Sequence, residues 1–153
     1  MMKKISYLIL IVIILSGCEN KEEQSKNNYI AYKNNLLEID HYTKSIPLDI
    51  IVNLERKDNQ TIDYQVLFQN PKETMHKIKA MVVNNYSNEN IFPTIGLFDE
   101  TEELLINSQE KNKLELSGTI ETTKNISNLK LNLKVWIEYQ NDAGEKKEIY
   151  YQV

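Results

Sequence analysis

From Ile46 to the C-terminus, apolar and polar residues alternate along most of the chain. A period of two places successive side chains on opposite faces of an extended strand. The segments that follow this period, each bounded by polar turn residues, are 46–54, 62–68, 78–82, 91–97, 114–120, 129–139 and 147–153. Pro93 marks the fourth segment as an edge strand, because proline has no amide hydrogen to donate to a ladder. The pattern predicts about seven to eight short strands, each with one apolar face.

The last two segments predict a hairpin whose register follows from its loop. A three-residue loop that ends with Gly144 in the left-handed region pairs Asn141 with Glu145. The same register sets Glu138 opposite Glu148, a mildly unfavourable pair of like charges. It also pairs Ile137 with Ile149, Val135 with Tyr151 and Leu133 with Val153 on one face. A slip of one residue would mix the two faces, so the apolar pattern selects this register.

Strands with one apolar face each bury that face when two antiparallel sheets pack together. Over residues 46–153 the pattern resembles an immunoglobulin-like or fibronectin-type domain, which implies an all-β antiparallel sandwich. The cysteine pair of antibody domains is absent, because Cys18 is the only cysteine in the chain. A small antiparallel barrel remains the alternative, since its strands show the same period.

The first 18 residues have the pattern of an export signal. Lys3 and Lys4 precede a mainly apolar run from Ile5 to Leu15, which is about half the roughly 20 residues that a membrane-spanning helix needs. The run ends in Leu15-Ser16-Gly17-Cys18, which resembles the lipobox of bacterial lipoproteins. The resemblance implies that residues 1–17 are a signal peptide, cut between Gly17 and Cys18. The alternative is an ordinary secretory signal with an inert cysteine.

The same resemblance implies a localisation and a first partner. In bacterial lipoproteins the cysteine thiol carries diacylglycerol, so Cys18 is the expected lipidation site, with palmitate-type acyl chains. Two or three acyl chains are enough for stable anchoring in a bilayer. We therefore expect a lipoprotein on the cell membrane that faces the outside of the cytoplasm.

Two segments separate the lipobox from the sandwich. Residues 18–28 contain no large apolar side chain after Cys18 and are predicted to be a disordered tether. Residues 29–45 form a lead-in that we expect to be helical or irregular, since Tyr29, Tyr32 and Leu36 lie at helical spacing. The sandwich is expected to fill residues 46–153.

Composition and charge exclude several classes of partner. The chain has 18 basic and 22 acidic residues, a net charge of −4, and removal of the signal peptide with Lys3 and Lys4 leaves −6. Nucleic acids and anionic lipid surfaces both need a basic face, so neither is an expected electrostatic partner. The four glycines lie too far apart to form a phosphate-binding loop, and no cofactor is expected.

The expected hairpin also provides a candidate binding face. Trp136 and Tyr150 lie opposite each other on the polar side of their strands, with Lys134 beside them. A pair of outward aromatic rings on a flat sheet is a suitable platform for a protein, peptide or glycan. The alternative is a stabilising cross-strand pair, covered by residues 29–37.

Catalytic and metal-binding patterns are weak. His41 and His76 are the only imidazoles, and neither has a serine or cysteine at a recognisable motif spacing. Two histidines are too few for a typical catalytic zinc site without carboxylates. The acidic run of Asp99, Glu100, Glu102 and Glu103 lacks the spacing of a calcium loop and is expected to be a solvated turn or first helical turn. We therefore predict neither catalytic nor metal-binding residues.

The sequence thus favours a non-enzymatic interaction or accessory module that is anchored outside the cytoplasm. Its partner beyond the bilayer is an unidentified protein, peptide or glycan. Two alternatives remain: a small hydrolase or metal-dependent enzyme that uses His41 or His76 with an acidic partner, and a passive envelope spacer.

Overall fold

The computed structural model describes residues 21–86 and 95–153. The chain divides after Asn34 into two compact units, and of the first the structure describes residues 21–34. These residues belong to helix α2 (Lys21–Glu38), whose last turn lies in the second unit. The second unit contains all the described strands. Cys18 and the signal peptide lie outside the described residues.

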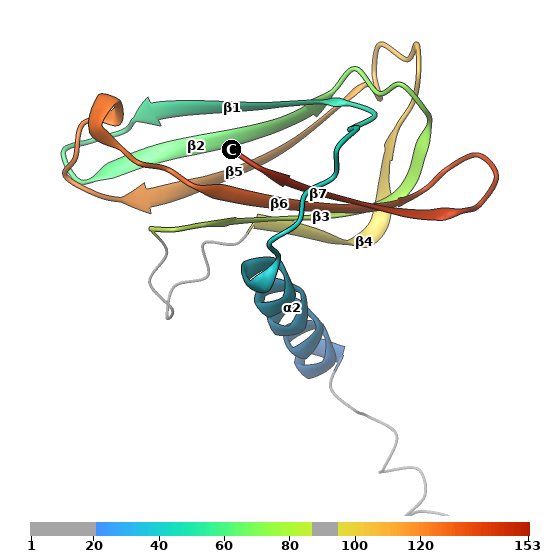
Figure 1. Cartoon of the computed structure of the whole chain (residues 1–153), viewed down its shortest axis with the longest axis horizontal. Coiled ribbons are helices and arrows are strands. Elements are labelled where there is room, and N and C mark those ends of the chain that lie inside the picture. The colour runs from blue at the N-terminus through green and yellow to red at the C-terminus, as the bar shows by residue number, and fades with distance from the viewer. Residues whose placement is uncertain (1–20, 87–94) are drawn as a thin grey trace, which may run out of the picture. The chain divides into compact units, whose positions relative to one another are not determined.

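The strands form two antiparallel sheets that face each other as two layers (Figure 1). One sheet has the order β1-β2-β5 and the other the order β4-β3-β6-β7. Their bounds are β1 Asp49–Arg56, β2 Thr61–Gln69, β3 Met75–Asn84, β4 Ile95–Leu104, β5 Lys113–Glu121, β6 Leu133–Gln140 and β7 Lys146–Gln152. A short 3-10 helix, η1 (Ile126–Asn128), precedes β6.

This topology confirms the predicted immunoglobulin-like sandwich. Hairpins join β1 to β2, β3 to β4, and β6 to β7, while the chain changes sheet after β2, β4 and β5. The crossing connections bring β5 beside β2 and β6 beside β3, which is the Greek-key arrangement of such sandwiches. Among the described strands no ladder joins the two sheets, so the barrel alternative is wrong.

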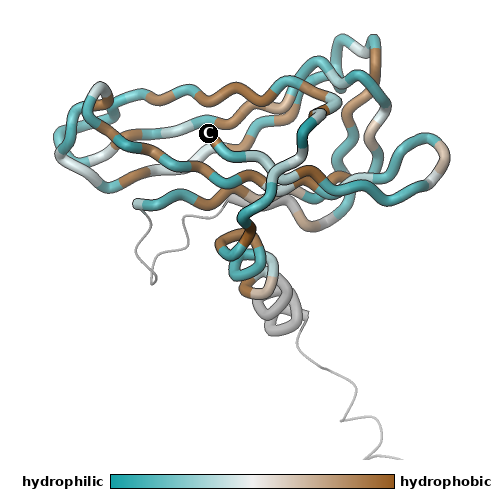
Figure 2. The backbone as a smooth tube through the Cα atoms, in the orientation of Figure 1, coloured by the Kyte–Doolittle hydropathy of each residue, from teal (hydrophilic) through white to brown (hydrophobic). Residues whose placement is uncertain are grey.

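The core lies between the layers and is built by the alternation that the sequence shows. Figure 2 shows apolar and polar residues alternating along the strands. Val66 of β2 and Val135 of β6 are fully buried. The other large side chains with almost no exposure include Tyr64, Phe68, Ile62, Met75, Ile78, Leu133, Ile137 and Tyr139.

The hairpin register is the one predicted. Ile137 pairs with Ile149, Val135 with Tyr151, Trp136 with Tyr150, and Glu138 with Glu148. Leu133 and Val153 exchange two backbone hydrogen bonds, and Gly144 has a φ of 77° at the end of the loop. The loop therefore fixes the register as its geometry requires.

Two predicted strand bounds need correction. β1 begins at Asp49 rather than Ile46, because the chain around Pro47 is not part of the ladder. The predicted strand 91–97 is described only from Ile95, within β4, and residues 91–94 with Pro93 lie outside the described residues. β6 begins at Leu133 rather than Leu129, because the Asn85 side chain binds the backbone of Lys130 and Asn132 in place of a neighbouring strand.

The tether prediction is also wrong in part. Residues 21–28, expected to be disordered, form the first half of α2. They include lysine, glutamate and glutamine, which are strong helix formers. The lead-in of residues 29–45 is helical to Glu38 and irregular beyond it. Within the described residues, no helix has the length and apolar character needed to cross a bilayer.

Candidate binding surfaces

The outer face of the four-stranded sheet carries the residues that the sequence indicates as a binding platform. Because Val135 and Ile137 point into the core, Trp136 points outward, with Met81 of β3 on one side and Tyr150 of β7 on the other. Trp136 is nevertheless only 4% exposed and Met81 is fully buried. The predicted pairing of the aromatic residues is present, but Trp136 does not form an open platform.

The last turn of α2 and the residues that follow it lie over part of this face. We call residues 35–44 the covering segment. Its Leu36 is 2% exposed, and the Lys134 ammonium donates hydrogen bonds to the carbonyls of Leu37 at 2.6 Å and Ile39 at 2.7 Å. Carbonyls at a helix C-terminus lack intrahelical partners, and a lysine there satisfies them and complements the helix dipole. Lys134 therefore holds the covering segment rather than an external ligand.

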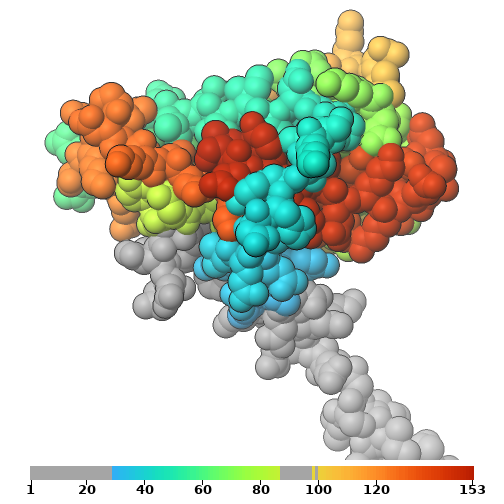
Figure 3. Space-filling view, viewed as in Figure 1, coloured from blue at the N-terminus to red at the C-terminus, as the bar shows by residue number. Residues whose placement is uncertain are grey.

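The other end of the covering segment is bound to β7. The Thr43 amide donates to the Tyr150 carbonyl at 2.8 Å, and the Tyr150 amide donates to Thr43 Oγ1 at 2.9 Å. The His41 and Tyr150 rings lie 5.9 Å apart. Figure 3 shows the covering segment, in cyan, lying against the red atoms of β7. The arrangement favours the covered cross-strand pair over an open aromatic patch.

The Tyr150 side chain is also held in place. Its hydroxyl donates to Glu148 Oε2 at 3.0 Å. Burial, together with the neighbouring Glu148 carboxylate, raises the pKa of Tyr150 to about 12. The phenol therefore stays protonated and keeps this hydrogen bond at neutral pH.

A buried carboxylate on the same sheet forms ion pairs with two lysine side chains. Glu138 is 5% exposed, with one carboxylate oxygen 3.3 Å from Lys79 Nζ and the other 2.7 Å from Lys146 Nζ. Lys79 also lies 2.5 Å from Glu100 of β4. The like-charge contact expected between Glu138 and Glu148 is thus offset by two cations.

The structure brings His76 together with two acidic side chains. Its Nδ1 lies 2.9 Å from Glu103 Oε1 of β4, and its Nε2 lies 3.0 Å from Asp142 Oδ1 of the β6–β7 hairpin. The hydrogen bond with Glu103, and then that with Asp142, raises the pKa of His76. An imidazole with a carboxylate at each nitrogen is stabilised as the cation and has no free nitrogen to act as a base.

His41 and the acidic run also differ from what an enzyme or metal site needs. The His41 side chain is 80% exposed, with Asp40 at 3.4 Å as its ion-pair partner. The acidic run, expected to be a turn, belongs to strand β4, where Glu100 pairs with Lys79 and Glu103 with Lys111 and His76. In the part of the chain that the structure describes, no three His, Cys, Asp or Glu residues are placed to hold a metal ion.

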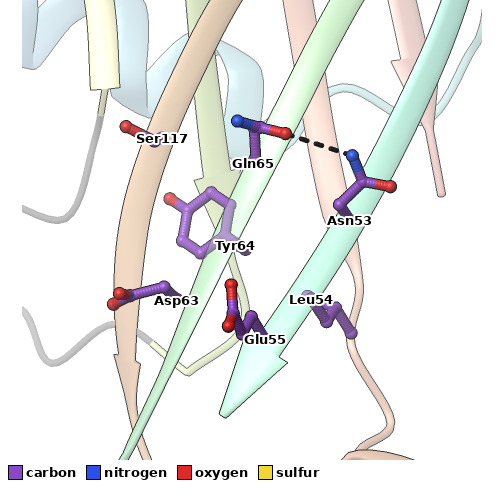
Figure 4. A pocket seen from close by; sticks show the side chains of 7 residues that line it. All are labelled: Asn53, Leu54, Glu55, Asp63, Tyr64, Gln65 and Ser117. Atoms are coloured by element: carbon purple, nitrogen blue, oxygen red, sulfur yellow. Dashed lines mark hydrogen bonds between the residues drawn. The ribbon is translucent and has the colours of Figure 1, made fainter. Parts of the chain in front are cut away.

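The outer face of the three-stranded sheet contains a hollow that the sequence did not reveal. It has a volume of about 470 Å³ (Figure 4). Polar side chains from three strands line it, and Leu54 and Tyr64, whose side chains face the core, complete its floor. The polar lining residues are Asn53 and Glu55 of β1, Asp63 and Gln65 of β2, and Ser117 of β5.

The strand register arranges this lining in two rows. Gln65 lies between Asn53 and Ser117, and Asp63 lies between Glu55 and Thr119. The Asn53 amide donates to Gln65 Oε1 at 3.1 Å, as Figure 4 shows. In the second row the Thr119 hydroxyl donates to Asp63 at 2.9 Å. These hydrogen bonds fix the side chains before any ligand is present.

Comparison with known proteins does not assign the chain to a family. No family model matches the chain, and no curated protein matches it. Among solved structures, the yeast GGA1 GAE domain is similar, with 15% sequence identity and a TM-score of 0.47. The match covers 74% of this chain and 95% of that one. No residue role follows from a likeness this distant.

The His76 cluster predicts a pH dependence of stability. Because the pKa of His76 is raised in the folded state, its stabilisation is fully present below about pH 6.5 and is lost as the pH rises through the folded-state pKa. The loss should be no more than about 1 kcal/mol, since the ring and both carboxylates are partly exposed. Urea unfolding between about pH 5.5 and pH 8 measures it.

His76→Gln should remove this pH-dependent loss. The matched variant His41→Gln, at an exposed histidine outside the cluster, should keep it. The same pH dependence in both variants would contradict the assignment to His76.

Proposed function

We propose that this chain is an extracytoplasmic interaction module, held on the membrane by acyl chains on Cys18. The observation that carries the proposal is the lipobox Leu15-Ser16-Gly17-Cys18, which follows a basic and then apolar segment and contains the only cysteine of the chain. That cysteine has no disulfide partner, so acylation is the chemistry that best accounts for it.

The sandwich supports the interaction role because its outer faces and loops can contact a partner. Immunoglobulin-like sandwiches present two outer faces and two sets of loops on a rigid frame, and many binding domains use them in this way. Here the chain's own covering segment binds Lys134 and Tyr150 on the four-stranded sheet. We therefore assign partner contact to the outer face of the three-stranded sheet. An enzymatic role has no support from His76, because both of its ring nitrogens face carboxylates.

The anchor is tested by moving the thiol. Cys18→Ser should abolish incorporation of an alkyne-labelled fatty acid and leave the signal peptide uncut, as intact-mass measurement and gel mobility would show. The matched double variant Cys18→Ser/Ser25→Cys keeps one cysteine near the same place but outside the lipobox, and it should stay unlabelled. Fatty-acid label on either variant would contradict acylation at Cys18.

The interaction role is tested by photo-crosslinking in living cells. A photoreactive residue at Ser117 of β5, an exposed position that lines the hollow, should give a discrete adduct with a second protein. The same residue at Glu110, an exposed position in the loop before β5, should give none. Absence of an adduct from Ser117 would favour a passive spacer instead.

A further inference from the structure

The outer face of the three-stranded sheet is strongly acidic. The outward positions of β1, β2 and β5 carry one lysine, Lys113, and no aromatic side chain. They also carry five carboxylates, which are Asp49, Glu55, Asp63, Glu115 and Glu121. Such a face attracts positively charged groups and is repelled by anionic lipid headgroups.

Two of these carboxylates stand directly opposite each other at the hollow. Glu55 of β1 and Asp63 of β2 are partners in the strand register, and both line the hollow. Directly opposed like charges destabilise a strand pair. The ammonium nitrogen of Lys57 lies 3.7 Å from Asp63 Oδ2. Glu55, in contrast, forms no hydrogen bond or ion pair with the described residues. A cation placed between the two carboxylates would remove their repulsion.

The remaining polar groups of the hollow mainly accept hydrogen bonds. The Asn53 amide donates to Gln65, and the Gln65 amide donates to Glu115 Oε1 at 2.5 Å, so this ladder uses amide donors of both side chains. The Asn53 carbonyl oxygen and the Glu55 carboxylate stay available beside it. A lining rich in acceptors fits a ligand rich in donors, and an arginine guanidinium offers five N–H groups in a plane.

We propose that this face binds a positively charged, extended segment of a partner protein, with an arginine or lysine side chain seated in the hollow between Glu55 and Asp63. The proposal rests on the proposed function and names the chemistry of the partner. A hollow of about 470 Å³ lies within the range of ligand sites and is large enough for one such side chain. Sugar rings stack on aromatic side chains, and this face presents none outward, so a protein segment fits better than a glycan.

The test uses the full-length chain purified from membranes in neutral detergent. The probe is a short blocked peptide of alternating arginine and threonine, and its control has glutamine in place of arginine. Fluorescence anisotropy should show binding of the arginine peptide that weakens as salt is added, and about tenfold weaker or no binding of the control.

A matched pair of variants locates the binding. Glu55→Gln should weaken the arginine peptide about threefold to fivefold, because it removes one partly exposed charge pair. It should not lower the Tm, since Glu55 has no partner among the described residues to lose. Glu110→Gln removes the same charge from the loop before β5 and should leave the affinity unchanged.

Several results would overturn the proposal. Equal affinities for the two peptides, or equal effects of Glu55→Gln and Glu110→Gln, would exclude a charge-selective hollow. A neutral oligosaccharide that binds in place of the peptide would make the face a glycan site. If Ser117 crosslinks a protein in cells and the arginine peptide does not bind, the interaction role stands and the cationic partner is wrong. If Ser117 gives no adduct, the proposed function itself fails.

Discussion

The burial of Trp136 on the outer face of the four-stranded sheet is the constraint on which the rest of the account depends. A sandwich has two outer faces, and an uncovered tryptophan beside Met81 would leave an apolar patch open to water. Lys134 and Tyr150 bind the covering segment at its two ends. Residues that would make a good external platform are thereby used within the chain, and the polar face of the opposite sheet is left for a partner.

The alternation and the turns of this sequence were enough to predict the sandwich and one register. Gly144 closes a loop that allows only one pairing with an apolar face, and the structure has that pairing. Strand ends were less predictable, because they depend on side chains distant in sequence. Asn85, for example, replaces a strand neighbour for the residues before Leu133. The charged segment after Cys18 has no apolar residue to bury, which predicts disorder, but its strong helix formers favour the helix that the structure has from Lys21.

The candidate sites, too, could be predicted only as far as local sequence pattern determines them. Alternation identifies Trp136 as outward-facing, but it does not say what lies above an outward residue. The hollow joins side chains from β1, β2 and β5, and the crossing connections that bring β5 beside β2 leave no local sequence signal. The acidic run of β4 resembles a solvated turn because local sequence does not show that cations on β3, such as Lys79, pair with it.

Hydrogen exchange at β7 tests the covered face most directly. Since Leu133 and Val153 exchange two hydrogen bonds, the amides of Glu148, Tyr150 and Gln152 point to the open edge of the sheet. The account predicts slow exchange of the Tyr150 amide, which donates to Thr43, and fast exchange at Glu148 and Gln152. Equally fast exchange at all three positions would contradict it, because the covering segment would not then be bound to β7.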